Sequence, residues 1–520
     1  MTDTIHQSLP RVPSGIEALD LILKGGFLEG GIYMVMGKPG AGKTILGNQI
    51  CFNHVANGHR AVYMTLLTET HARMLAHLHE MAFYDPASVG DALTYISGYT
   101  TLEREGLSGF IKLVTQVIRE YKCTVLIIDG IATAEATSAS EIEYRRFLHE
   151  LQVLVETMRC TAFLLAQPSR GTVHPEHTMV DGVIRLTDTI LGPRAVRELE
   201  VTKFRGSNYL RGLHSFEITT EGISLYPRIE ARLANNTHQI SANPTRKTFG
   251  VQRFDEMLHG GLVSGSCTTL LGAPGSGKTV LGLHFLHTGL QNGEKALYLG
   301  FYESPERLVA KALALGLDLR GYIESGQLTL RWIPNSEIIP DLLAEDILDA
   351  VYNGGIKRLF LDGIEPFHDS MIYPERTSRF FTALMNELLA YDVTTCITAE
   401  LPDLFSDRIN ISIPHMSALV DNVIFLRYVE LRSQLYRLIS IMKLRDSDYD
   451  PSIREFRISE KGISVASTFR SAEAILTGVA RPLPIENKDS ADSEPDTTVE
   501  KRNWDVRQDR HTENDTDNRR

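Results

Sequence analysis

Short apolar runs of four to six residues recur along the chain, separated by longer segments in which apolar positions return every three or four residues. A short continuous apolar run is typical of a strand buried on both faces, and the longer period is typical of a helix with one buried face. In the first half of the chain this pattern predicts strands at 32–36, 61–66, 125–128 and 162–166, and helices at 44–55, 74–81 and 141–158.

The second half of the chain repeats the pattern. It predicts strands at 267–271, 296–301, 358–361 and 395–399, and a helix at 279–291. Buried strands that alternate with helices indicate an α/β fold with a mostly parallel sheet covered on both faces. The later part of each half is richer in β-branched residues, and we expect it to add antiparallel edge strands at 183–186, 199–203, 216–219, 423–426, 437–443 and 455–458.

The repeat predicts two tandem domains followed by a polar tail. The copies join within 226–247, where Asn235-Asn236-Thr237 and Asn243-Pro244-Thr245 are typical of a solvated linker. We place the domains at 1–235 and 236–483, and the tail at 484–520. The tail has too few apolar residues to offset the entropy of ordering, so we expect it to be disordered, either without a role or as a partner-binding segment.

Composition narrows the functional classes. The chain has 520 residues and a formal net charge of −12, which argues against a large basic surface for nucleic acid. Its five cysteines are scattered without a Cys-x-x-Cys pair, which argues against a disulfide framework or a zinc site. The sequence has no signal-peptide pattern and no apolar run of about 18 residues, so we expect a cytoplasmic protein that does not span a membrane.

Two glycine-rich segments carry the strongest chemical signal, because both match Gly-x-x-x-x-Gly-Lys-[Ser/Thr]. They read Gly37-Lys38-Pro39-Gly40-Ala41-Gly42-Lys43-Thr44 and Gly272-Ala273-Pro274-Gly275-Ser276-Gly277-Lys278-Thr279. The lysines are 278 − 43 = 235 residues apart, and the pairs Gly15/Gly250, Asp20/Asp255 and Gly25/Gly260 keep this offset. A chance glycine-rich turn would not recur in register.

Loops of this pattern bind nucleotide phosphates. The glycines let backbone N–H groups curl round the phosphates, the lysine neutralises their charge, and the threonine hydroxyl holds Mg²⁺. The helix that follows adds the positive end of its dipole. We therefore predict a nucleotide with Mg²⁺ at each loop, with Lys43 and Lys278 on the phosphates and Thr44 and Thr279 on the metal.

Two aspartates complete the predicted metal sites. Asp129 and Asp362 each close a buried strand, at similar distances from the loop lysine (129 − 43 = 86 and 362 − 278 = 84). A carboxylate at this place in the fold holds the Mg²⁺ shell, usually through water.

Hydrolysis also needs a group that orients or deprotonates water. Glu69 and Glu303 follow the second strand of each copy at 69 − 43 = 26 and 303 − 278 = 25 residues from the lysine, which suits a general base. A glutamate that caps a helix or lies in its first turn would have the same spacing. Gln167 and Glu400 end the next strand, where they could sense the γ-phosphate or be polar strand ends.

Two pairs of cations also repeat. Lys203 and Arg205 match Lys443 and Arg445 at a constant offset of 443 − 203 = 240. Residues two apart on a strand point the same way, so each pair could reach the phosphates of a neighbouring subunit. A solvated strand face is the alternative.

Taken together, these residues resemble the KaiC family of circadian clock proteins, within the RecA-like P-loop ATPases. The resemblance covers about residues 10–480. Besides the two loops and the two Lys-x-Arg strands, it rests on Ser14-Gly15-Ile16, Asp20 and Gly25-Gly26, and in the second copy on Asp421-Asn422, Tyr428-Val429-Glu430 and Ile453-Arg454-Glu455-Phe456.

The resemblance implies a two-ring homohexamer with ATP and Mg²⁺ bound between subunits. It implies slow ATP hydrolysis in the N-terminal ring, and autokinase and autophosphatase activity in the C-terminal ring. Lys203, Arg205, Lys443 and Arg445 would contact the neighbour's nucleotide, and a KaiB-like or other signalling protein would be the partner.

The sequence departs from the family pattern in two places. The family has two adjacent glutamates after the second strand, whereas Thr68-Glu69 and Tyr302-Glu303 keep only the second. The family's adjacent Ser-Thr phosphoacceptors correspond to Ser417-Ala418, so only Ser417 can accept phosphate here. Residues 469–479 resemble the loop that controls kinase activity in the family.

Three functions are therefore compared. The first is a KaiC-like ATPase with serine/threonine autokinase activity at Ser417, acting as a regulatory timer or signalling hub. The second is a nucleotide-gated scaffold without significant turnover, which the missing glutamates favour. The third is a RecA-type DNA-dependent ATPase, against which the acidic balance of charge argues.

Overall fold

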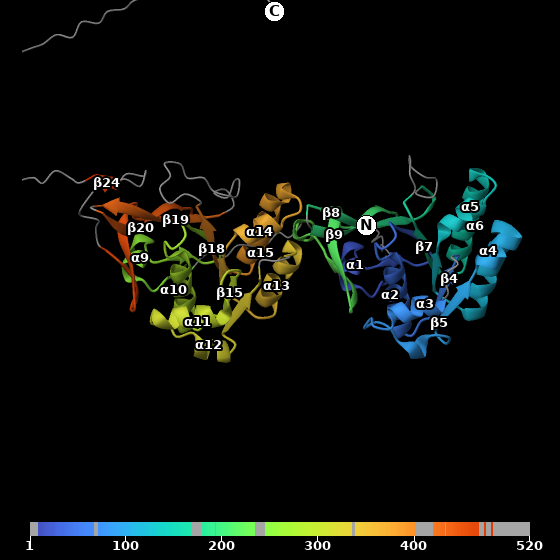
Figure 1. The fold of residues 1–520 in the computed structure, drawn as a ribbon, viewed down its shortest axis with the longest axis horizontal. Coiled ribbons are helices and arrows are strands. Elements are labelled where there is room, and N and C mark those ends of the chain that lie inside the picture. Colours follow the sequence, from blue (N-terminus) through green and yellow to red (C-terminus); the bar gives the residue numbers. More distant parts are fainter. Residues whose placement is uncertain are drawn as a thin grey trace, which may run out of the picture.

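The computed structural model describes residues 9–66, 71–168, 178–192, 194–234, 245–334, 338–401, 420–431, 433–466, 473–474 and 480–481. Within these residues the chain forms two successive α/β units that lie side by side along the long axis of the molecule (Figure 1). This confirms the tandem α/β architecture, while the exact boundary at 235/236 stays a prediction. The tail at 484–520 lies outside the described residues.

The first unit is built on a sheet of nine strands. In chain order they are β3 (Ile32–Gly37), β4 (Ala61–Thr65), β5 (Leu93–Ser97), β6 (Val125–Asp129), β7 (Thr161–Ala166), β8 (Gly182–Leu191), β9 (Arg194–Phe204), β10 (Leu213–Thr219) and β11 (Gly222–Tyr226). Their order in the sheet is β11-β10-β9-β8-β3-β7-β6-β4-β5. A small ribbon of β1 (Arg11–Val12) and β2 (Phe27–Leu28) precedes them.

Helices cover both faces of this sheet. They are α1 (Glu17–Ile22), α2 (Lys43–Ala56), α3 (His71–Leu78), α4 (Tyr99–Tyr121), α5 (Ile131–Thr137) and α6 (Glu141–Thr157), with a short 3₁₀ turn η1 (Pro86–Ser88). Helix α8 (Ile229–Arg232) follows the last strand of the unit. Alternate residues of β3 divide between two cores: Tyr33 and Val35 pack with α1, α2 and α3, while Met34 and Met36 pack with α4, α5 and α6. Such a three-layer arrangement explains why β3 is buried along its whole length.

The second unit repeats this plan. Its strands are β14 (Cys267–Gly272), β15 (Ala296–Gly300), β16 (Leu328–Trp332), β17 (Arg358–Asp362), β18 (Thr394–Glu400), β19 (Asn422–Leu431), β20 (Gln434–Leu444), β21 (Arg454–Ser459) and β22 (Gly462–Val465), in the sheet order β16-β15-β17-β18-β14-β19-β20-β21-β22. The short strands are β12 (Arg246–Lys247), β13 (Leu262–Val263), β23 (Glu473–Ala474) and β24 (Ala480–Arg481).

The helices of the second unit also lie in two layers. They are α9 (Gln252–Met257), α10 (Lys278–Gln291), α11 (Pro305–Ala314), α12 (Arg320–Glu324), α13 (Pro340–Tyr352), α14 (Glu365–Ser370) and α15 (Thr377–Ala390), with the 3₁₀ turn η2 (Pro374–Arg376). One core contains residues of α13, α14 and α15, and the other contains residues of α9, α10 and α11. None of the described helices is both long enough and apolar enough to cross a membrane.

The predicted strands are present, although β8, β9 and β19 each extend five residues beyond one predicted end. The pairing refines one expectation. β8 and β19 pair in parallel with β3 and β14, so antiparallel pairing begins one strand later, at β9 and β20. From there to β11 and β22 every pairing is antiparallel, as expected for the β-branched end of each copy.

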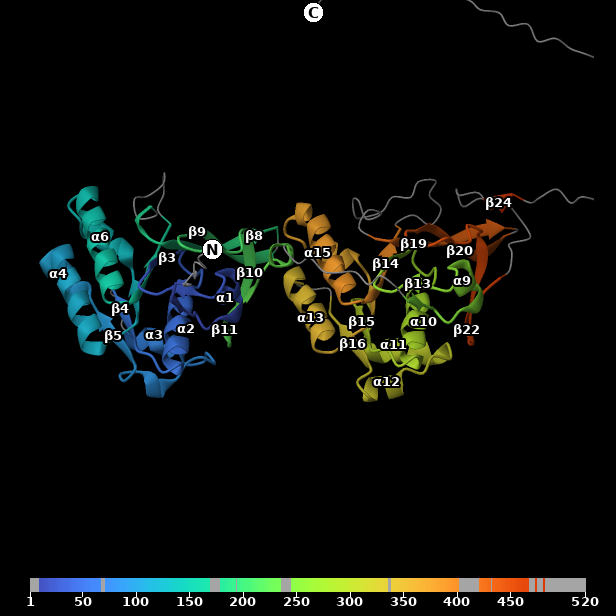
Figure 2. The same ribbon diagram turned by 180° about the vertical axis from the view of Figure 1, so that it is seen from behind.

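The two units touch through a network of charges. Arg376 in η2 donates to Glu230 of α8 (Nε–Oε1 2.7 Å) and to Asp341 of α13 (Nη2–Oδ1 2.9 Å), and the N–H of Ile229 donates to Asp341 at 3.2 Å. The side chain of Asp341 is only 1% exposed. Ile229 is buried in the same core as α13 and α15, so α8 belongs to the packing of the second unit. Figure 2 shows α13 and α15 beside β8 and β10 from behind.

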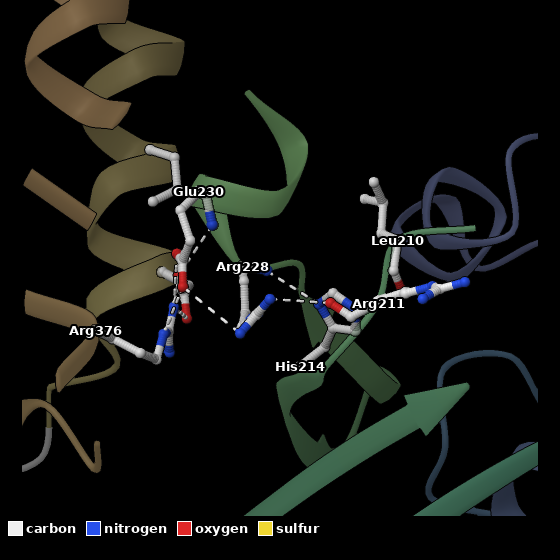
Figure 3. Close-up of polar contacts among 8 residues, drawn as sticks. Leu210, Arg211, His214, Arg228, Glu230 and Arg376 are labelled. Carbon is white, nitrogen blue, oxygen red and sulfur yellow. Dashed lines mark hydrogen bonds and ion pairs between the residues drawn. The ribbon is translucent and has the colours of Figure 1, made fainter. Parts of the chain in front are cut away.

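The network continues into the first unit. The N–H of Arg228 donates to Nδ1 of His214 at 3.1 Å, and Nε2 of His214 lies 3.1 Å from the carbonyl of Leu210 (Figure 3). His214 is fully buried. The connection between the units is therefore held by hydrogen bonds on both sides of α8.

Candidate functional site

The first glycine-rich loop connects β3 to α2. β3 ends at Gly37 and α2 begins at Lys43, so the loop lies at the carboxyl end of a central parallel strand. Lys43 folds back over the loop and donates from Nζ to the carbonyls of Gly37 (2.7 Å) and Lys38 (3.0 Å). This arrangement directs the ammonium group and the first N–H groups of α2 toward the same space, where phosphate oxygens would be bound.

The second loop has the same geometry. β14 ends at Gly272, α10 begins at Lys278, and Nζ of Lys278 donates to the carbonyls of Gly272 (2.8 Å) and Ala273 (3.0 Å). Burial lowers the pKa of both loop lysines, because the charged form loses hydration. A phosphate group would offset that loss.

Glycine is required immediately before each lysine. Gly42 and Gly277 adopt φ of 96° and 106°, in the left-handed region. A Cβ at Gly42 would lie 2.8 Å from Cδ1 of Ile218, and one at Gly277 would lie 2.6 Å from Cε1 of Phe456. The last strands of each sheet thus press against the loop and fix its shape.

The predicted metal-binding residues meet in both units. Oγ1 of Thr44 lies 3.3 Å from Oδ2 of Asp129, and Oγ1 of Thr279 lies 3.2 Å from Oδ1 of Asp362. Asp129 also accepts from the hydroxyl of Tyr63 at 2.7 Å, and Asp362 from Tyr298 at 3.1 Å. Burial raises the pKa of Asp362, and its hydrogen bonds to Thr279, Thr398 and Tyr298 lower it in part.

This donor set fits Mg²⁺. Each unit offers one hydroxyl and one carboxylate to the metal. Most of an octahedral shell is then left to phosphate oxygens and water, which is the usual state of Mg²⁺ beside a nucleotide. The described residues contain no cluster of three or more His, Cys, Asp or Glu that would hold a metal by protein ligands alone. A bound nucleotide would therefore complete the site.

The predicted general base of the second unit, Glu303, lines a cavity that also contains the loop lysine and the strand-end aspartate. Glu303 precedes Ser304, the N-cap of α11, and so is neither the cap nor a first-turn residue. Its Oε1 forms an ion pair with Lys311. Its counterpart Glu69 lies outside the described residues, as do Ser417 and most of the segment 469–479.

The cavity of the second unit is rich in carboxylates. It has a volume of about 340 Å³ and reaches from the glycine loop to the ends of β15, β17 and β18. Four acidic residues line it together with Lys278 and Lys311, namely Glu303, Asp362, Glu365 and Glu400. Glu400 lies 3.7 Å from Nζ of Lys278. Glu365 was not identified from the sequence, because its place depends on how the start of α14 packs beside β18.

The four repeated cations lie away from the loop of their own unit. β9 ends beside the start of β8, which is level with the start of β3, whereas the loop follows the other end of β3. Lys203 and Arg205 both donate to the carbonyl of Thr178, at 2.9 and 2.7 Å, and so point the same way.

The second pair of cations occupies the same place. Lys443 donates to the carbonyl of Val420 at 2.6 Å, and Arg445 pairs with Asp421 at 3.0 Å. The side chains of Arg205 and Arg445 are each 52% exposed. Neither pair is brought together with the phosphate loop of its own unit, so any contact with nucleotide would be made to another chain.

Comparison with known proteins agrees with this geometry. The ATPase family model described as KaiC matches residues 12–230 and again 247–469. The chain is 28% identical over 523 residues to the circadian clock oscillator protein KaiC of Thermostichus vulcanus, covering 93% of this chain and 96% of that protein. It is 26% identical to the protein of the same name from Synechococcus elongatus (93% and 94% covered) and 25% identical to that of Parathermosynechococcus lividus (93% and 90%).

Proposed function

Because this chain belongs to the KaiC family of ATPases, we propose that it binds MgATP at both glycine-rich loops, hydrolyses it slowly and works as a ring-shaped regulatory timer or signalling hub. The observation that carries the proposal is the duplicated contact set. In both units a loop lysine caps two loop carbonyls, and a threonine hydroxyl lies beside a strand-end aspartate.

The roles of these residues follow from their chemistry. The loop N–H groups and Lys43 or Lys278 bind the phosphates and stabilise the charge that builds up as the γ-phosphate leaves. Thr44 with Asp129, and Thr279 with Asp362, would hold Mg²⁺, which supplies further charge stabilisation when bound. Glu69 is the proposed carboxylate that orients or deprotonates water in the first unit, and Glu303 is the residue that the sequence predicts for this role in the second.

We propose that the nucleotide sites are completed between chains of a homohexamer. Lys203, Arg205, Lys443 and Arg445 lie at the end of the sheet opposite their own loops, and the side chains of the two arginines are half exposed. A neighbouring chain in a ring could present them to a nucleotide, as trans-acting arginines do in other phosphoryl-transfer proteins. A KaiB-like or other signalling protein is the proposed partner of the assembly.

Autokinase activity at Ser417 is part of the proposal. Ala418 lacks a hydroxyl, so phosphorylation here would be a one-site switch and not an ordered two-site cycle. Transfer would move the γ-phosphoryl group from ATP to the Ser417 oxygen and release ADP.

ATP turnover and label transfer, measured together, test these assignments. With γ-labelled ATP we expect slow release of phosphate and label on the protein. Glu69→Gln should slow release at the first site by at least about tenfold, and Ser417→Ala should abolish the label. Ser412→Ala, five residues earlier, is the matched control and should keep it. Label that persists in Ser417→Ala would contradict the autokinase assignment.

A nucleotide-gated scaffold is the second candidate function. The ion pair between Glu303 and Lys311 favours it, because a carboxylate held by a lysine is less available to a water molecule. Under this alternative ATP would be bound at both loops without measurable release of phosphate.

A further inference from the structure

The two nucleotide sites differ at the place where the γ-phosphate would lie. Three residues after the strand-end aspartate, the first unit has Ala132 (129 + 3) and the second has Glu365 (362 + 3). At the end of the next strand, the first unit has Gln167 and the second has Glu400. The second site therefore has a carboxylate at each of two positions where the first site has an uncharged side chain.

Glu365 is held in place by the backbone of the neighbouring strand. It is the first residue of α14, three residues after Asp362 at the end of β17. Its Oε1 accepts the N–H of Glu400 at 2.6 Å, which fixes the carboxylate between the ends of β17 and β18. Its Oε2 is buried and has no hydrogen-bond partner among the described residues. The side chain lines the same cavity as Lys278 and Thr279.

Glu303 is in a different state. Its Oε1 forms an ion pair with the ammonium group of Lys311, a residue of α11. The ion pair ties this carboxylate to a side chain of that helix. Oε2 of Glu303 is also buried without a hydrogen-bond partner among the described residues. The two glutamates therefore differ in the partner of Oε1, which is the side chain of Lys311 for Glu303 and the backbone N–H of Glu400 for Glu365.

We propose that Glu365, in place of Glu303, orients and deprotonates the attacking water in the second nucleotide site, an inference that rests on the ATPase function proposed above. Water oxygen forms a bond to the γ-phosphorus and the bond from that phosphorus to the β–γ bridging oxygen breaks. ADP leaves with the electron pair of the broken bond, and the water proton passes to Oε2 of Glu365 and then to solvent.

The surroundings of Glu365 suit this role. Burial raises the pKa of the carboxyl, the N–H of Glu400 and the ammonium group of Lys278 lower it in part, and the carboxylate of Glu400 raises it further. A base whose pKa is moved upward toward neutral takes a proton more readily in the transition state. Ala132 cannot do this in the first unit, so the two sites use different residues for the same step.

The test isolates the second site. Lys43→Ala removes the first site, and phosphate release is then measured with and without Glu365→Gln. The amide keeps an oxygen to accept the N–H of Glu400, so the fold is preserved while the base is lost. We expect release to fall at least about tenfold, with the affinity for MgADP unchanged within about twofold. Asp369→Asn, which neutralises an exposed carboxylate on the same helix, should change neither.

The outcomes separate this inference from the function on which it rests. If Lys43→Ala releases phosphate faster than Lys43→Ala/Lys278→Ala and Glu365→Gln leaves that rate unchanged, the second site is an ATPase and the role of Glu365 is wrong. A fall in rate matched by an equal loss of MgADP affinity would likewise overturn it, because that indicates a binding defect. If Lys43→Ala shows no release above the double variant, the proposed ATPase activity of the second site fails and the inference fails with it.

Discussion

Individual side chains at the two loops were accessible to sequence reasoning because their chemistry depends on short spacing. The loop fixes Lys43 and Thr44 within one turn of helix, and a strand-end carboxylate follows from the apolar run before it. Glu365 was missed because its function depends on contact with Glu400, 35 residues later in the chain. No local pattern distinguishes such a residue from an ordinary first-turn glutamate.

The buried side chain of His214 predicts that the stability of the protein depends on pH. Burial lowers its pKa to about 4, and Nδ1 accepts the N–H of Arg228. The unfolded chain has the ordinary His pKa of about 6.5 and so binds more protons than the folded chain between these values. Stability should therefore fall as the pH drops from about 6.5 to about 4, with a contribution from this residue on the order of 3 kcal/mol.

The measurement is chemical unfolding across that pH range. His214→Asn keeps an acceptor near Arg228 without a titrating ring, so its stability should depend less on pH than that of the wild type. His54 and His284 have pKa values lowered to about 4 by burial, so part of the dependence will remain. The exposed His149→Asn is the control. An unchanged pH dependence in His214→Asn would contradict the assignment.

Helices and strands were predicted correctly where the spacing of apolar residues along the chain was regular. The strands that carry the loops and aspartates were predicted within one or two residues, because burial on both faces produces an unbroken apolar run. The long helix α4 was not predicted. Gly106 lies within it at φ 67° and interrupts the helical backbone, so the apolar period breaks there.

The packing of α8 against the second unit predicts that the stability of this unit depends on Arg376. Removing the Arg376 side chain leaves Asp341, which is 1% exposed, without its charged partner. Breaking a buried ion pair from one side typically costs about 3–5 kcal/mol. We expect Arg376→Ala to lower the unfolding midpoint of the second unit in thermal or denaturant unfolding. Arg379→Ala, an exposed residue on α15, should unfold like the wild type; equal midpoints for both variants would contradict the account.

The assembly of whole chains was inferred from the family resemblance and not from the residue pattern. The repeat predicted two units, but the contacts between them depend on residues as far apart as Glu230 and Arg376, which no periodicity connects. The placement of Lys203 and Arg205 relative to their own loop likewise needed the strand order. Assembly into a ring remains a proposal supported by that placement.

Mixing two inactive variants tests whether neighbouring chains share a site. With Lys278→Ala in both partners, one carries Lys43→Ala and the other Arg205→Ala, so each alone should hydrolyse ATP poorly at the first site. If arginine acts in trans, mixed rings regain activity at about a quarter of their interfaces, where an intact loop meets an intact Arg205. Co-assembled rings with no more activity than the two separate variants would contradict shared sites.

The central claim is that both loops are working ATP sites, and the most direct measurement is steady-state phosphate release by four proteins. These are the wild type, Lys43→Ala, Lys278→Ala and the double variant. We predict slow release by the wild type, a partial loss in each single variant and no release above background in the double variant. A wild-type rate no faster than that of the double variant would contradict the claim and leave the chain as a nucleotide-gated scaffold.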